Sequence, residues 1–167
     1  MRATDLSREL RRDSGDFLEE RRGIVCASLT AIGCMGLIAL YQMGVIKHLP
    51  EPPLPGLDAD KVDASDEAYS HLQMGDAFIG LGSYAATMGL AAMGGKNRVK
   101  EQPWIPLALA AKAGVDALQA AKLTYDQYAK HRAACFWCLV AAAATFVTVA
   151  LVMPEARAAA RELEGRF

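Results

Sequence analysis

Hydrophobic and polar positions divide the chain into four long apolar stretches joined by polar segments. The stretches cover residues 23–46, 72–95, 104–124 and 133–153. The first and fourth contain no charged residue, the second contains only Asp76, and the third contains Lys112, Asp116 and Lys122. A helix needs about 20 mostly apolar residues to cross the ~30 Å hydrocarbon layer of a bilayer. The pattern therefore predicts an all-α integral membrane four-helix bundle.

The polar segments predict the organisation of the rest of the chain. Residues 1–22 form a polar N-terminal segment, 23–153 the four-span membrane bundle, and 154–167 a C-terminal tail that starts at Pro154 and continues as a polar helix. A short surface helix is expected over residues 8–20. Residues 47–71 contain four prolines and several acidic residues, which predicts a solvated loop acting as a lid.

Lysine and arginine are distributed unevenly between the two sides of this bundle. Twelve of them lie in residues 1–22, 94–103 and 154–167, whereas five lie in or next to the other two connections, namely Lys47, Lys61, Lys122, Lys130 and Arg132. Because cytoplasmic segments carry the excess of positive charge, both termini are expected to be cytoplasmic. The loop at 47–71 and the start of the fourth stretch then face the outside, where disulfides persist.

Small residues predict close contacts between the helices. Gly33 and Gly36 give the first stretch a small-residue face, and Gly75, Gly80, Gly82 and Gly89 recur in the second. Such residues let transmembrane helices approach each other closely.

Composition excludes some functions. The net charge is -1 and no basic patch is present, so no nucleic-acid partner is expected. The chain has four cysteines, but no Cys/His spacing resembles a zinc site, so no metal is expected.

The motif with the clearest chemistry is Cys135-Phe136-Trp137-Cys138 at the start of the fourth stretch. Two cysteines three residues apart share one face of a helix and can form a small disulfide. The positive end of the helix favours a thiolate, and contact with lipid favours redox exchange with a quinone. The alternative is that both residues simply pack within the bundle. Cys26 and Cys34 lie too far apart along one helix to pair, and are expected to be buried structural thiols.

Other polar residues gather at the same outer level. Tyr125, Tyr128 and His131 precede the motif, and His48 and His71 flank the acidic loop. They are interpreted either as the mouth of a pocket that binds a quinone carbonyl or supplies protons, or as interfacial residues that bind lipid headgroups.

The charges within the third stretch also have two interpretations. Lys112 and Asp116 are four residues apart and can pair along one face. They either form a self-neutralising structural pair or mark a functional site inside the membrane.

Two segments resemble the vitamin K epoxide reductase family. Residues 123–139, which hold the CxxC motif, are similar to the family's third-to-fourth span junction, and residues 75–84, which end at Tyr84, are similar to the opening of its second span. The resemblance is to a short bacterial form with no fused thioredoxin-like domain.

This resemblance implies a membrane thiol-disulfide oxidoreductase that passes electrons from a thiol partner through the CxxC pair to a quinone, either menaquinone or ubiquinone. Cys135 and Cys138 would be catalytic: Cys138, the deeper thiol, would meet the quinone, and Cys135, nearer the surface, would exchange with the partner. The quinone-binding residues would be Tyr84, Tyr125, Tyr128 and His131. The location would be the bacterial inner (cytoplasmic) membrane, as a multi-pass protein with its CxxC on the outer face, and the thiol partner a thioredoxin-like periplasmic protein.

The chain departs from the family pattern in two places. The family usually has a second cysteine pair in the first outer loop, but residues 47–71 contain no cysteine; the family often has a tyrosine one turn after the CxxC, but position 142 is Ala142. Either an external partner reduces Cys135 directly, or the chain has lost the full cycle. The alternative function is therefore a non-catalytic or cofactor-holding membrane subunit of a larger complex.

Overall fold

The computed structural model describes residues 3–12, 15–70 and 73–166, and every regular element named in these ranges is a helix. The prediction of an all-α protein is confirmed for this part of the chain. The elements, in chain order, are α1 (Ala3–Arg12), α2 (Leu18–Gln42), α3 (Ala59–Asp63), the 3-10 helix η1 (Asp66–Tyr69), α4 (Asp76–Ala92), α5 (Arg98–Glu101), α6 (Trp104–Asp126), the π-helix η2 (Gln127–His131) and α7 (Phe136–Glu164).

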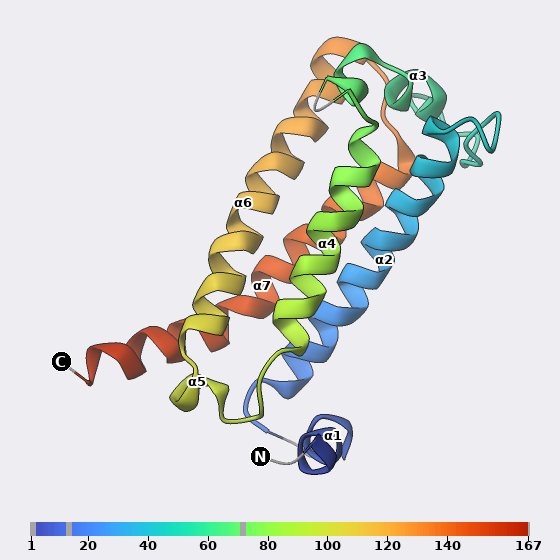
Figure 1. Cartoon of the computed structure of the whole chain (residues 1–167). Coiled ribbons are helices and arrows are strands. Elements are labelled where there is room, and N and C mark those ends of the chain that lie inside the picture. Colours follow the sequence, from blue (N-terminus) through green and yellow to red (C-terminus); the bar gives the residue numbers. More distant parts are fainter. Residues whose placement is uncertain (1–2, 13–14, 71–72, 167) are drawn as a thin grey trace.

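The four long helices α2, α4, α6 and α7 run side by side, as Figure 1 shows. Helix α2 packs closely against α4 and α7, and α7 also packs against α6, whereas α4 and α6 touch less. Segments α3 and η1 lie at one end of these helices, which we call the cap end. Helix α1, α5 and the last turns of α7 lie at the opposite end. Which end faces the cytoplasm stays a prediction.

Two of the long helices, α2 and α7, are long and apolar enough to cross a membrane. Only 33% and 28% of their most apolar windows are buried inside the protein, whereas the core helix of a soluble protein would be mostly buried. Helix α4, with 17 residues, and the more polar α6 do not meet the same test. The four predicted spans are thus supported at two helices and stay a prediction at the other two.

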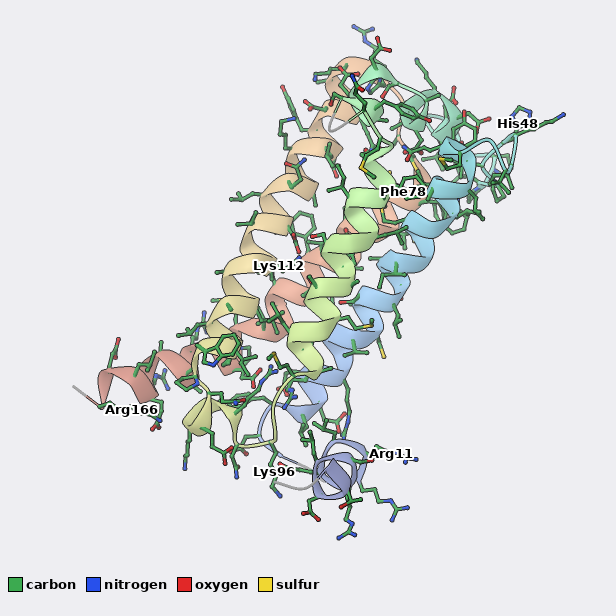
Figure 2. All side chains as sticks on the ribbon, in the orientation of Figure 1. Arg11, His48, Phe78, Lys96, Lys112 and Arg166 are labelled. Atoms are coloured by element: carbon green, nitrogen blue, oxygen red, sulfur yellow. The ribbon has the colours of Figure 1, made fainter. Side chains whose placement is uncertain are left out.

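Charged side chains gather at the two ends of the long helices. Figure 2 marks His48 at the cap end, Arg11, Lys96 and Arg166 at the opposite end, and Lys112 between them on α6. This distribution agrees with helices whose middle parts lie in an apolar surrounding.

The N-terminal polar segment differs from its predicted structure, whereas the predicted helical tail at the C-terminus is confirmed but continues the fourth long helix without a break. The N-terminal helix is α1, at Ala3–Arg12, and residues 15–17 separate it from α2, so the predicted helix over 8–20 is wrong. Helix α7 passes through Pro154 to Glu164, so the predicted tail is helical but is not separated from the fourth span. The turns beyond Pro154 are held by burial of Glu155, Ala156 and Ala159.

Glycines make close helix contacts at Gly80, which was predicted, and at Gly23, which was not, but not at Gly33 or Gly36. A Cβ at Gly80 would lie 2.8 Å from Met35 Sδ, and a Cβ at Gly23 would lie 2.8 Å from Leu151 Cδ1. A larger residue there would require the Met35 or Leu151 side chain to move aside, so these glycines let the two side chains pack directly against the helix backbone. A Cβ at Gly33 or Gly36 would meet no described atom within 4 Å, so the small-residue face predicted there makes no close contact.

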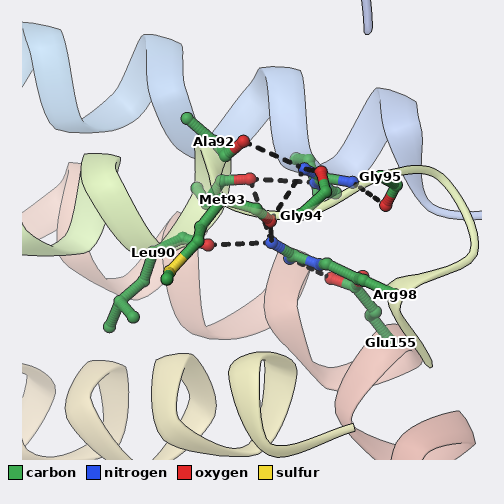
Figure 3. A network of polar contacts seen from close by, with 9 residues as sticks. Leu90, Ala92, Met93, Gly94, Gly95, Arg98 and Glu155 are labelled. Carbon is green, nitrogen blue, oxygen red and sulfur yellow. Dashed lines mark hydrogen bonds and ion pairs between the residues drawn. The ribbon is translucent and has the colours of Figure 1, made fainter. Parts of the chain in front are cut away.

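The end opposite the cap is closed by a network of two buried arginines, drawn in Figure 3. Arg98 is 0% exposed and forms a bidentate ion pair with Glu155, with both N–O distances at 2.6 Å. Its guanidinium also donates hydrogen bonds to the carbonyls of Leu90, Ala91 and Met93. Arg21 donates to the carbonyls of residues 91–95. The last carbonyls of a helix have no partners within the helix, so the two guanidinium groups satisfy the end of α4.

Candidate active site

The CxxC motif spans the junction between the loop and α7. Cys135 is the N-cap residue of α7, and its sulfur accepts a hydrogen bond of 3.2 Å from the backbone N–H of Cys138. Both thiols are free. The hydrogen bond and the positive end of the helix dipole stabilise negative charge on the Cys135 sulfur.

The accessibility of the two sulfurs is opposite to the one expected from their order. Cys135 is 0% exposed, whereas Cys138 is partly exposed and lines a cavity. The expectation that Cys135 is the surface thiol is therefore wrong. Its cause is the loop that follows α2, which folds over the N-terminus of α7 instead of extending into solvent.

That loop forms an ordered cap, here defined as residues 47–70. The cap is fixed to α7 by backbone hydrogen bonds from Asp58 N to Ala134 O and from Ala134 N to Gly56 O, at 3.0 and 2.8 Å. Trp137 Nε1 donates to Pro50 O at 2.7 Å. These contacts hold the cap against the two cysteines. Most cap residues are exposed, as predicted for a solvated lid, but the segment is ordered and buries Leu49, Ala59, Val62, Asp63 and Ala68.

The cap places one carboxylate directly at the thiols. Asp63, at the end of α3, is 2% exposed, and its Oδ1 lies 3.5 Å from Cys138 Sγ. One carboxylate oxygen and the two sulfurs all lie within 4.8 Å of one another. Burial raises the pKa of Asp63 to about 6; hydrogen bonding to Cys135 and Cys138 acts in the opposite direction. Charge repulsion from Asp76 and Glu51 contributes to the raised pKa.

The connection between α6 and α7 fixes the first cysteine. Gln127, 6% exposed, accepts a hydrogen bond of 2.9 Å from the backbone N–H of Cys135 through its Oε1. Gln127 begins the π-helix η2, which ends before Arg132, a residue with a left-handed backbone (φ 49°). Single π-turns are frequent at functional sites because they redirect a side chain without ending the helix. Here the π-turn brings the amide of Gln127 beneath Cys135.

A cavity of about 250 Å³ begins at Cys138 and Asp63 and extends between the long helices. Its walls come from α2, α4, α6, α7 and the cap, with the polar groups of Ser83, Tyr84 and Asp116 among apolar neighbours. The volume is close to the lower end of the ~300–1,000 Å³ that is usual for small-molecule sites, which suits a compact ring system. Mostly apolar walls with a few polar groups are typical of such sites.

The predicted quinone-binding residues fall into two groups. Tyr84 and His131 line the cavity, and Tyr84 Oη lies 2.9 Å from Thr145 Oγ1. Tyr125 and Tyr128 are 68% and 81% exposed and do not line it. Their role stays a prediction, which the geometry does not support.

The histidines do not form one cluster among the described residues. His131 lies beside Glu67, with 3.6 Å between Nε2 and Oε2, and His48 is hydrogen-bonded to Asp60 at the outer side of the cap. His71 lies outside the described residues.

Lys112 and Asp116 form a polar cluster at the α4–α6 contact. Lys112 Nζ lies 2.5 Å from Asp116 Oδ2 and 2.8 Å from both Ser83 Oγ and Thr87 Oγ1. The predicted pairing is confirmed. Because Asp116 and Ser83 also line the cavity, the cluster forms part of its polar wall as well as a self-neutralising contact.

The two other cysteines lie apart from the motif. Cys34 is 4% exposed in a core cluster with Ala31 and Ala141, in agreement with the expected structural thiol. Cys26 is exposed on α2, so the expectation of burial is wrong there.

Sequence reasoning missed Asp63 and Gln127. Asp63 is one of several acidic residues in a segment whose composition predicts a solvated loop. Gln127 is the first residue of the π-helix that follows α6, and no sequence motif predicts this π-helix. The one available indication for Asp63 was its position in a short apolar-flanked segment, Val62-Asp63-Ala64.

Asp63, Cys135 and Cys138 also bear on the prediction that there is no metal site. They supply two sulfurs and one carboxylate oxygen within 4.8 Å of one another, a donor set that could hold a metal ion. The absence of a metal stays a prediction.

One buried and one cavity-lining cysteine at the start of a long helix, in an all-helical protein, form the arrangement expected of a membrane thiol oxidoreductase. The family model described as "Vitamin K epoxide reductase family" matches residues 23–153, and the chain belongs to this family. Proteins of this family are membrane proteins, and its enzymes act on quinones. Neither the curated proteins nor the solved structures contain a match to the chain.

Proposed function

We propose that this protein is a four-span thiol-disulfide oxidoreductase that passes two electrons from a thiol partner through Cys135 and Cys138 to a quinone. The observation that carries the proposal is that Cys138, hydrogen-bonded to the first cysteine through its backbone, lines the cavity enclosed by the four long helices. A quinone ring in this cavity would meet a sulfur directly.

The reaction balances with the groups at hand. The two thiols lose two electrons and two protons and form one disulfide bond, while the quinone gains two electrons and two protons and becomes a hydroquinone. A dithiol of the partner then reduces the disulfide and is itself oxidised. The tail of the quinone lies outside the small cavity, among the lipid.

The family pattern has a tyrosine at the position of Ala142, and in this chain Tyr84 can take its place as a hydrogen-bond partner of the quinone. Ala142 lines the cavity without a polar group, and Tyr84 on α4 brings its hydroxyl to the same part of α7, beside Ala141 and Thr145. A phenol at this point can donate a hydrogen bond to a carbonyl oxygen. Tyr84 is the cavity residue to which we assign quinone binding, with His131 at the cavity's cap end.

Access of the thiol partner depends on the cap. Cys135 is fully covered, so a partner dithiol reaches it only when residues 47–70 move away from α7. The backbone contacts around Ala134 and the Trp137–Pro50 hydrogen bond would have to open. A thioredoxin-like periplasmic protein has the dithiol chemistry that this step needs.

The membrane arrangement is part of the proposal. Residues 1–22 and 154–167 are cytoplasmic, residues 23–153 form the membrane bundle, and the cap and CxxC face the outside of a bacterial inner membrane. Two of the basic residues that support this orientation, Arg21 and Arg98, are buried in the network of Figure 3. The exposed arginines of the N-terminal segment and the C-terminal helix support the same orientation.

The test uses purified protein in lipid vesicles with a soluble dithiol and either a menaquinone or a ubiquinone analogue. Wild type should turn over with at least one of the two quinones, and thiol trapping should show a quinone-dependent Cys135–Cys138 disulfide. Cys135→Ala and Cys138→Ala should each abolish turnover. The control is Cys26→Ala, which removes an exposed thiol on α2 and should leave turnover unchanged.

A wild type that forms no quinone-dependent disulfide would contradict the proposal. The alternative function, a non-catalytic or cofactor-holding subunit of a larger complex, would then account for the missing loop cysteines.

A further inference from the structure

Asp63 has three properties that are not expected of a carboxylate with a purely structural role. Its Oδ1 lies 3.5 Å from Cys138 Sγ, its Oδ2 is buried without a hydrogen-bond partner among the described residues, and the side chain is 2% exposed. Burying a carboxylate without full hydrogen bonding costs free energy, so the fold bears this cost at the thiol pair.

The contacts that hold the cap are made by other groups. The backbone of residues 56–58 pairs with Ala134, Trp137 donates to Pro50, and Asp60 accepts from the backbone N–H of Leu49. The Asp63 side chain accepts a hydrogen bond from the Cys138 thiol, and the Cys135 thiol lies beside it as well. Its position is therefore set by the fold, while its carboxylate remains available to the sulfur and to the cavity.

We propose that Asp63 is the catalytic acid–base group of the thiol–quinone reaction, which takes the proton from the Cys138 thiol and delivers it to the reduced quinone oxygen. This inference rests on the proposed function. Asp63 touches the reacting sulfur and lines the cavity in which the quinone would lie, so one carboxylate reaches both ends of the proton transfer.

The proton balance follows from these contacts. As the S–S bond forms, the thiol proton of Cys138 passes to the Asp63 carboxylate, and the two electrons pass to the quinone. The protonated carboxyl then donates this proton to one quinone oxygen, and the second proton of the hydroquinone is the one released by Cys135. When a partner dithiol later breaks the disulfide, Asp63 takes part in returning a proton to the Cys138 sulfur.

The surroundings of Asp63 suit a group that exchanges protons near neutral pH. The titratable groups that act on it are Cys135 and Cys138 on α7, Asp76 on α4 and Glu51 in the cap. Tyr41 on α2 also interacts with it electrostatically. Burial raises the pKa of Asp63 to about 6. A group of this pKa is deprotonated enough at pH 7 to accept a proton and acidic enough to return it.

The test measures single-turnover oxidation of the reduced protein by a quinone analogue across pH. Asp63→Asn keeps the shape but cannot exchange the proton, so the rate should fall roughly a hundredfold or more, which is the usual size of general acid–base catalysis. The wild-type rate should fall as pH drops below about 6, and this limb should be absent in Asp63→Asn. Asp63→Glu should recover part of the rate.

The matched control is Glu51→Gln. Glu51 is another cap carboxylate with a buried, unpartnered Oε2, but it neither contacts a sulfur nor lines the cavity. This variant should keep the wild-type rate at pH 7 and should keep the acid limb that Asp63→Asn loses. The limb should move to slightly lower pH, because one of the charges that raise the pKa of Asp63 is gone.

A second measurement does not depend on the stability of the Asn variant. Redox-difference infrared spectra of wild type and Glu51→Gln should show a change in the C=O band of a protonated carboxyl when the thiols are oxidised. In Asp63→Glu this difference band should be shifted or missing. Wild-type activity together with an unchanged rate and pH profile in Asp63→Asn would overturn the inference and leave the proposed function intact. Inactive wild type that a small oxidant still converts to the disulfide would instead overturn the proposed function.

Discussion

The two ends of the helix bundle both bury charged side chains, but they treat them in opposite ways. At the end opposite the cap, Arg98 and Glu155 form a complete ion pair, and Arg21 and Arg98 together satisfy the carbonyls that end α4. At the cap end, Asp63 is buried with one oxygen unpartnered beside two free thiols and a cavity. The difference teaches that the first end is built for stability, and that the second keeps an unsatisfied group where chemistry needs one.

The largest expected effect breaks the satisfied end. Arg98→Ala leaves Glu155 buried without its partner and the end of α4 without its donors, so the free energy of unfolding should fall by about 3–5 kcal/mol. Thermal unfolding in detergent would measure this loss. Arg157→Ala, at an exposed position on α7, is the control and should change stability by less than about 0.5 kcal/mol. An Arg98→Ala protein as stable as the control would show that the network does not hold the helices together.

The next effect concerns the unsatisfied end and depends on pH. The pKa of Asp63 is about 6 in the folded protein, whereas that of a free aspartate side chain is 3.8. Folding therefore favours the protonated form: the folded protein binds more protons between these values, and stability should fall as pH rises from about 4 to about 6. Two pKa units correspond to about 3 kcal/mol at most.

Asp63→Asn should remove this pH-dependent loss and be at least as stable as wild type at pH 7. The measurement is the difference in unfolding free energy between the two proteins at pH 4, 5, 6 and 7, because other carboxylates titrate in both. A difference that stays constant with pH would show that Asp63 has an ordinary pKa.

A smaller effect concerns the cap itself. Trp137→Phe removes the hydrogen bond to Pro50 O while it keeps an aromatic ring, which should favour opening by about 1 kcal/mol. Alkylation of Cys135 in the reduced protein should then become roughly three- to tenfold faster. Mass spectrometry of the modified peptide reports it, and unchanged labelling would mean that this bond does not restrain the cap.

The smallest effect separates the two groups of predicted quinone ligands. Tyr84→Phe should raise the KM for the quinone several-fold, because its hydroxyl lies in the cavity wall, whereas Tyr128→Phe should leave kcat and KM unchanged, because its side chain is 81% exposed. Steady-state kinetics with one quinone analogue would compare them. Equal effects of both changes would place the quinone elsewhere than in this cavity.

The helices could be predicted from sequence because their apolar stretches are long and nearly uncharged. The Lys112–Asp116 pair was also predictable, since spacing along one helix fixes it. The cap could not be predicted in this way. Its prolines and acidic residues have the composition of a solvated loop, and only tertiary contacts with Ala134 and Trp137 turn it over the cysteines.

The unpredicted cap is also the reason why the exposure of the two thiols was predicted in the wrong order. Position along a helix predicts which sulfur is deeper in a membrane, but it says nothing of a segment 70 residues earlier in the chain that folds over the helix start. Asp63 and Gln127 could not be predicted as site residues for the same reason, because each has its role only through contact with Cys135 or Cys138.

The central claim is that the thiols under the cap give their electrons to a quinone. The most direct measurement is an anaerobic single turnover of reduced protein in lipid, with hydroquinone measured by absorbance and the Cys135–Cys138 disulfide by mass spectrometry in the same samples. The account predicts that the two products appear at the same rate and in a ratio of one hydroquinone to one disulfide. Hydroquinone formed while both cysteines remain reduced, or a disulfide that forms equally without quinone, would contradict it.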